Sequence, residues 1–69
     1  MSDHVYKSVE ITGSSPEGVT QAIDRAVAKA AESVRGIDWF ELTSVRGQIE
    51  DGRVAHYQAT LKIGFRLED

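Results

Sequence analysis

Trp39 and Gln58 are the side chains whose types best suit the binding of a planar ligand. The indole of Trp39 offers a flat π-face on which an aromatic ring can stack with offset contact. The amide of Gln58 donates and accepts hydrogen bonds at once, which matches the alternating hydrogen-bond donors and acceptors along the edge of a pyrimidine-like ring. Each residue has an alternative role, because tryptophan also anchors subunit interfaces and a strand glutamine is often only solvated.

Two arginines, Arg46 and Arg66, are candidate contacts for an anionic or aromatic part of such a ligand. A guanidinium group binds oxyanions through two parallel hydrogen bonds and also stacks on π-faces. A salt bridge with a nearby carboxylate is the alternative role for each arginine.

The remaining titratable side chains do not form a recognisable catalytic or metal-binding pattern. His4 and His56 have no second imidazole or cysteine at ligand spacing, so we expect no metal site. Glu50 and Asp51 fall at a predicted hairpin tip, where carboxylates are solvated, and no nucleophile has an evident partner base. The sequence therefore predicts a binding protein and not an enzyme.

Composition and charge exclude several classes of partner. The net charge is −3 and the chain has no cysteine, which argues against nucleic-acid and anionic-membrane surfaces and against disulfides. No apolar run approaches the ~20 residues of a membrane helix, and the first residues lack the layout of a signal peptide. We expect one cytoplasmic domain over residues 1–69, with neither a nucleic-acid nor a membrane partner.

The elements that must position these side chains follow from the hydropathy pattern. Alternation predicts a first strand over Val5–Ile11, and apolar residues at three- and four-residue spacing predict a helix. This helix should begin at about Pro16, behind a capping Ser15, and end at Gly36. Two further strands follow, joined by an Asp-Gly hairpin turn, at 38–49 and 54–67.

This element order predicts an α+β fold, in which one strand, one helix and two strands follow each other. A crossover makes the first two strands parallel and the hairpin reverses the third, so a central third strand gives an antiparallel sheet of order 1-3-2. We expect this three-stranded sheet to wrap on the single helix.

The hairpin turn also predicts which residues of the last two strands lie opposite each other. An Asp51-Gly52 loop makes the numbers of paired residues sum to 103. The resulting pairs are, on the helix side, Leu42 with Leu61, Phe40 with Ile63 and Arg46 with Tyr57, and on the other side Trp39 with Gly64, Glu41 with Lys62, Thr43 with Thr60 and Val45 with Gln58. A bulge in the second strand would shift the pairs near Arg46.

The chain is too small and its third strand too long for a stable monomer. A 7.6 kDa chain hides only roughly 60% of its surface on folding, and domains of this size commonly rely on disulfides, metals or partner subunits. The third strand would span ~45 Å, and one helix covers only one face of the sheet. We therefore expect a closed homo-oligomer.

Several separated motifs, in order and spacing, resemble the dodecins, which are small flavin-binding proteins. The resemblance runs nearly end to end and is carried by Val5-Tyr6-Lys7, Gly13-x-Ser15, Asp38-Trp39-Phe40-Glu41, Val45-Arg46-Gly47, Tyr57-Gln58 and Gly64-Phe65-Arg66-Leu67-Glu68. It implies a hollow homododecamer that binds flavins in pairs at two-fold-related sites between subunits.

The resemblance also implies roles for individual residues. In that family the motif tryptophan stacks on the isoalloxazine ring and the glutamine bonds the ring's polar edge, which assigns these roles to Trp39 and Gln58. Bacterial members with arginines at the positions of Arg46 and Arg66 tend to be associated with flavin mononucleotide (FMN). Some are linked to coenzyme A, for which Lys29 is a candidate phosphate contact, a solvated lysine being the alternative.

The function that the resemblance implies is storage, buffering and photoprotection of FMN or riboflavin. Two alternatives stay open on the sequence. The first is a small flavin-dependent redox protein that uses the same pocket. The second is a purely structural oligomer in which Trp39 is only an interface anchor.

Overall fold

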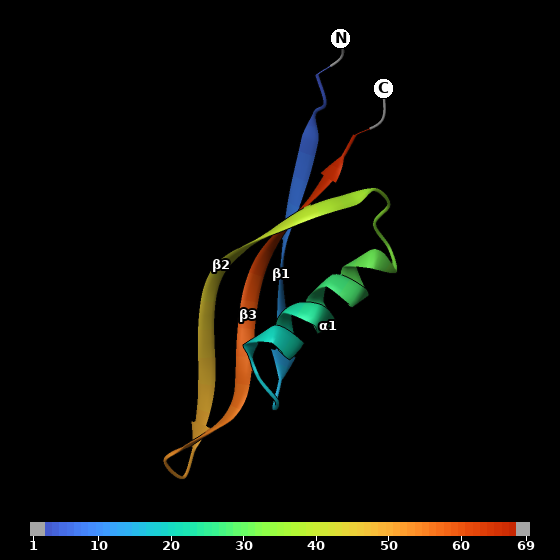
Figure 1. The fold of residues 1–69 in the computed structure, drawn as a ribbon. Coiled ribbons are helices and arrows are strands. Elements are labelled where there is room, and N and C mark those ends of the chain that lie inside the picture. Colours follow the sequence, from blue (N-terminus) through green and yellow to red (C-terminus); the bar gives the residue numbers. More distant parts are fainter. Residues whose placement is uncertain (1–2, 68–69) are drawn as a thin grey trace.

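The computed structural model describes residues 3–67 and contains one helix and one three-stranded sheet (Figure 1). The elements follow in the order β1 (Tyr6–Ser15), α1 (Val19–Ala31), β2 (Ile37–Glu50) and β3 (Arg53–Arg66). The sheet is antiparallel with the strand order β1-β3-β2. The predicted fold class and strand order are therefore confirmed.

The core lies where α1 crosses β1 and β3. Small side chains on one stripe of the helix meet large ones on the central strand, and the buried set is Ala22, Ala26, Ala30, Ala59, Leu61 and Ile63. The alanines let the helix lie close to the sheet. Gly13 permits the nearest approach, because a Cβ at this position would overlap the carbonyl of Ala22 and lie 2.9 Å from the Cβ of Ala26.

Gly13→Ala should destabilise the protein, because the added methyl group forces α1 away from the sheet. Overpacking of this kind costs about 1 to 3 kcal/mol. We expect a lower midpoint of thermal unfolding, measured by circular dichroism, and an unchanged midpoint for Ser14→Ala, whose side chain is exposed. Equal midpoints for Gly13→Ala and the parent would show that the helix can move away from the sheet without loss of stability.

The helix is shorter than predicted at both ends. Residues up to Ser15 stay paired with β3, so the predicted start at Pro16 is wrong and α1 begins after Gly18. Ser15 does not cap the helix, since its Oγ accepts a hydrogen bond from the backbone N–H of Glu17 at 3.0 Å. Gly36 has the expected positive φ of 73° but belongs to the turn that leads into β2.

The predicted pairing of β2 with β3 is correct beside the turn and from Trp39 to Leu42, and wrong between these two stretches. Trp39, Phe40 and Leu42 have their expected partners, but Thr43 is an extra residue between two paired positions. This bulge shifts the following pairs by one, and a second irregularity near Gln48 restores the register. As a result Arg46 lies opposite Gln58 and not opposite Tyr57.

The bulge moves Arg46 to the other face of the sheet. Paired residues of an antiparallel sheet project to the same side, and Gln58 alternates with Ala59 and Leu61, which face α1. We call the face opposite α1 the open face. It carries Trp39, Glu41, Ser44 and Arg46 from β2 and Gln58, Thr60, Lys62 and Gly64 from β3.

Beyond Ile37, which packs against the core, the strand β2 lies outside the cover of the helix, which packs on β1 and β3 (Figure 1). Four of its apolar side chains on the helix side of the sheet are 41–70% exposed, and we call them the apolar stripe: Phe40, Leu42, Val45 and Ile49. The molecule measures 56 × 20 × 14 Å and exposes 5210 Å², against ~4,300 Å² for a compact chain of this mass. The excess supports the expected self-association.

Candidate functional site

The indole of Trp39 lies flat on the open face at the end of the sheet near the chain termini. Trp39 is paired with Gly64, and a Cβ on Gly64 would overlap the indole atoms Cδ2, Cε2 and Cζ2. The ring therefore covers the backbone of β3 at the position where a side chain is missing. Trp39 is still 40% exposed, which leaves aromatic surface for a stacked ligand.

Three further side chains gather at this end of the open face. The Tyr6 ring lies with its centroid 6.3 Å from that of Trp39, at an interplanar angle of 57°. Arg66, paired with Tyr6 across the sheet, places its Nη1 3.3 Å from Nε2 of His4. A guanidinium group only donates hydrogen bonds, so Nε2 of His4 is the acceptor. We call Trp39, Tyr6, Arg66 and His4 the indole cluster.

Farther along the open face, Arg46 and Gln58 line a polar groove of about 480 Å³. Its other walls are one carboxylate and four hydroxyl side chains, from Glu10, Thr12, Thr43, Ser44 and Thr60. Two contacts fix these hydroxyls: Oγ1 of Thr12 lies 2.9 Å from Oγ1 of Thr60, and Oγ1 of Thr43 donates to the Thr60 carbonyl at 3.0 Å. The groove suits a ligand segment rich in hydroxyl or phosphate oxygens.

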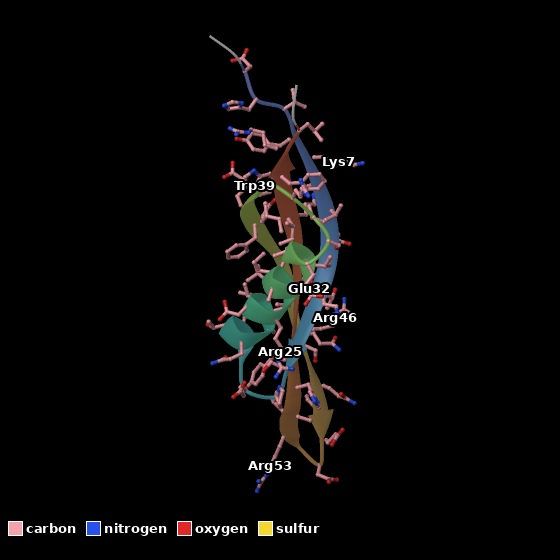
Figure 2. All side chains as sticks on the ribbon, turned by 90° about the vertical axis from the view of Figure 1, so that its right-hand side faces the viewer. Lys7, Arg25, Glu32, Trp39, Arg46 and Arg53 are labelled. Atoms are coloured by element: carbon pink, nitrogen blue, oxygen red, sulfur yellow. The ribbon has the colours of Figure 1, made fainter. Side chains whose placement is uncertain are left out.

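The two parts of the predicted site are far apart within one chain. Gly64, beneath the indole, and Gln58 are both on β3, and the six residues from one to the other span ~20 Å of extended strand. Figure 2 shows Trp39 near the end that carries the termini and Arg46 farther along, on the side of the sheet away from α1. One chain thus brings Arg46 together with Gln58, and Arg66 together with Trp39, but does not join the pairs.

Lys29 lies on the helix, away from the open face. Its Nζ forms an exposed ion pair with Glu32 at 3.4 Å, a contact of small energy. Lys29 and Arg25 line a cavity of about 410 Å³ between α1 and β1. This location separates Lys29 from the four other predicted contact residues.

Sequence reasoning missed the groove hydroxyls and the partners of the indole cluster. The face of each strand could be assigned, but Tyr6 and His4 join Trp39 and Arg66 only through the pairing of β1 with β3. The Thr43 contact depends on the bulge. A signal for that bulge does exist, because the apolar alternation changes phase between Leu42 and Val45.

Two further properties of the described chain bear on the classes considered. Within residues 3–67, no three His, Asp or Glu side chains gather closely enough to hold a metal ion. In the same part of the chain, α1 falls short of the length and hydropathy that a helix needs to cross a bilayer.

Comparison with known proteins gives one consistent family. The family model described as Dodecin matches residues 5–68, a match that includes Glu68, which lies outside the described residues. The dodecin of Thermus thermophilus is 48% identical over 65 residues, which cover 94% of each chain.

Solved structures agree with this match. Dodecin from Streptomyces coelicolor superposes with a TM-score of 0.92 at 58% identity, covering 100% of this chain and 99% of the other. Dodecin from Streptomyces davaonensis also gives a TM-score of 0.92, at 48% identity, covering 99% of this chain and 100% of the other. The family model, the sequence identity over nearly the whole length and the shared fold lead to one conclusion: this chain belongs to the dodecin family.

Proposed function

We propose that this protein binds and stores flavin, as FMN or riboflavin, at sites shared between copies of the chain in a hollow homododecamer. The observation that carries the proposal is the position of Trp39, whose indole lies on Gly64 with part of its surface exposed. This arrangement suits a flat heteroaromatic ring, because stacking on an exposed indole requires no side chain to move.

The separation of Trp39 from Gln58 supports a site made by two copies. A three-ring flavin stacked on the indole is too short to reach a side chain ~20 Å along the strand. A second chain can bring its own Gln58 to the ring that the first chain's Trp39 holds. Pairs of flavins around a two-fold axis would then give one flavin for each chain.

The polar groove is proposed to receive the ribityl chain or phosphate that leads away from the ring. Arg46 supplies a guanidinium group for the phosphate, and the hydroxyls of Thr12, Ser44 and Thr60 line the same groove. Arg66, which is paired with Tyr6 beside the indole, is proposed to contact the ring or the phosphate from the other end of the open face. The separate contributions of the two arginines stay predictions.

Storage and photoprotection are favoured over redox turnover by the stacking itself. An electron-rich indole in contact with an excited isoalloxazine donates an electron faster than the flavin emits, and rapid return of that electron dissipates the excitation. Such quenching suppresses flavin photochemistry. A redox protein would instead reduce or oxidise a second substrate, so steady turnover of an electron donor by the flavin-loaded protein would favour the alternative.

Coenzyme A is a further proposed ligand, at a different place. The cavity that Lys29 and Arg25 line holds two cations close to the exposed side chain of Ser33, which suits phosphate groups. Binding of coenzyme A to the parent and its weakening by Lys29→Ala would support this assignment.

Titration of flavin-free protein with FMN, followed by flavin fluorescence, tests the proposal. We expect emission to stay almost completely quenched until about one flavin per chain has been added, as for paired sites on two-fold axes. Emission that rises in proportion to added FMN from the start, as in buffer, would contradict flavin binding.

Gln58→Ala should weaken FMN binding without changing the size of the oligomer. The ring edge would lose its hydrogen-bond partners while stacking persists, a loss of about 1 to 2 kcal/mol. The same titration measures the affinity, and Gln48→Ala is a matched control because Gln48 is an exposed glutamine outside the groove on the neighbouring strand. An unaltered dissociation constant for Gln58→Ala would remove this residue from the site.

A further inference from the structure

We propose that Gly64 and Tyr6 are positioning residues for Trp39, which fix the orientation of its indole before a ligand binds. The proposal rests on the proposed function in one respect, since it assumes that Trp39 is the stacking surface. The orientation itself is a property of the flavin-free protein and can be measured without a ligand.

Gly64 lies directly beneath the indole of Trp39. It is buried, and the position that a Cβ would occupy is filled by three atoms of the Trp39 ring system. Any larger residue must therefore lift or tilt the indole, which changes the surface offered to a stacked ring. The φ of Gly64 is not in the left-handed region, so a substitution acts through this overlap and not through backbone strain.

Tyr6 contacts the indole of Trp39 from one side. Its ring meets that of Trp39 at a centroid distance of 6.3 Å and a tilt of 57°, within the range of favourable aromatic pairs. Tyr6 comes from β1, Gly64 from β3 and Trp39 from β2, so each strand of the sheet contributes one member. The contacts with Gly64 beneath the ring and with Tyr6 at its side limit rotation of the indole about its χ angles and leave its outer surface exposed.

Both contacts are poorly explained as core packing. Tyr6 and Trp39 are 41% and 40% exposed, and they lie apart from the buried cluster under α1. Their contact therefore contributes little to burial in the chain. Its effect is to restrict a side chain that would otherwise sample several rotamers at the surface, which lowers the entropy lost when a ring stacks on it.

The test uses the sole tryptophan of the chain as its own probe. Time-resolved fluorescence anisotropy of Trp39 in the flavin-free oligomer should show larger fast motion in Tyr6→Leu and an altered environment in Gly64→Ala. Tyr6→Phe keeps the ring and should resemble the parent. Gly47→Ala is the matched strand-glycine control, because its Cβ would lie 3.1 Å from the His56 carbonyl and away from the indole.

FMN affinity gives the second readout. Loss of the aromatic contact in Tyr6→Leu should raise the dissociation constant about two- to twelve-fold, the effect of one aromatic pair, and Gly64→Ala should raise it as well. Tyr6→Phe and Gly47→Ala should stay near the parent value. Size measurement by light scattering keeps loss of assembly apart from loss of the indole position.

Each outcome supports or overturns the proposal separately from flavin binding. Unchanged indole motion and environment in both Tyr6→Leu and Gly64→Ala would overturn it, whether or not the parent binds FMN. Altered indole motion with unchanged FMN affinity in assembled variants would also overturn it. A parent that fails to quench FMN would instead contradict the proposed function, while the anisotropy would still decide whether the two residues hold the indole.

Discussion

Trp39→Ala is expected to weaken FMN binding by about 1 to 3 kcal/mol, the range for a base-like ring stacked on an aromatic side chain, and to restore much of the bound flavin's emission. Both effects have one cause, because the indole that holds the ring is also the electron donor that quenches it. Titration with FMN measures the affinity, and the fluorescence lifetime of the bound flavin measures the quenching.

Trp39→Phe separates the two roles of the indole. Phenylalanine keeps a flat face but is a much poorer electron donor, so it should retain more affinity than alanine while the bound flavin becomes emissive. Light scattering must show that both variants are still assembled, since a dissociated protein would lose flavin for a different reason. An assembled Trp39→Ala protein that binds FMN as tightly as the parent, and keeps it dark, would remove Trp39 from the site.

The second large effect is expected on assembly. The parent should be a closed oligomer at low micromolar concentration, and Leu42→Glu should convert it to smaller species. Leu42 lies in the apolar stripe and is 41% exposed in the single chain, so a buried interface between copies would have to accept an unpaired carboxylate, which is strongly unfavourable.

Leu42→Met is the matched control, because it keeps the apolar stripe apolar at nearly constant volume. Size-exclusion chromatography with light scattering measures the mass, and circular dichroism shows whether the small species remain folded. A parent that runs as a 7.6 kDa chain would contradict self-association. A Leu42→Glu protein of full size would show that the apolar stripe lies outside the interfaces.

The sequence was sufficient for the fold because its strongest patterns reflect the central strand and the helix. Ala59, Leu61 and Ile63 occupy every second position of the central strand, with polar residues between them, and all three are buried. The helix bounds were harder to predict, since Gly13 and Ser15 look like a turn and a cap. In the structure these small residues belong to β1 beneath the helix. Small side chains are needed there because α1 packs close to the strand, and not because the chain turns.

The register near Arg46 shows a different limit. A hairpin turn predicts the pairs only as far as the strands stay regular, and an extra residue at Thr43 reverses the faces of the residues that follow. The apolar residues of β2 change from even positions, at Phe40 and Leu42, to odd positions, at Val45 and Ile49. This change marks the extra residue. Treating it as evidence for a bulge would have placed Arg46 on the open face. The pairing of Arg46 with Gln58 also requires the second irregularity, near Gln48.

The candidate site was predictable in its residue types and only partly in its geometry. Trp39 lies over Gly64 as the turn register predicted. The two irregularities between the turn and Trp39, near Gln48 and at Thr43, shift the pairs in opposite directions and cancel. The distance between Trp39 and Gln58 was already implied by the pairing of Trp39 with Gly64, which lies six residues from Gln58 on β3. The contribution of Tyr6 was not, because it depends on how β1 aligns with β3.

The central claim is that flavin binds at a site to which one chain gives Trp39 and another gives Gln58. Mixed oligomers from co-expressed Trp39→Ala and Gln58→Ala chains test it most directly, with oligomers of each single variant as controls. In a random mixture about a quarter of such shared sites would recover both intact side chains.

The measurement is an FMN titration of the mixed oligomers, read as the fraction of sites that bind with the affinity of the parent. We expect this tight class to appear in the mixture, at about a quarter of the chains, and to be absent from both controls. If the mixture contains no tight class, no two chains can complete a site together, and the shared flavin site is contradicted.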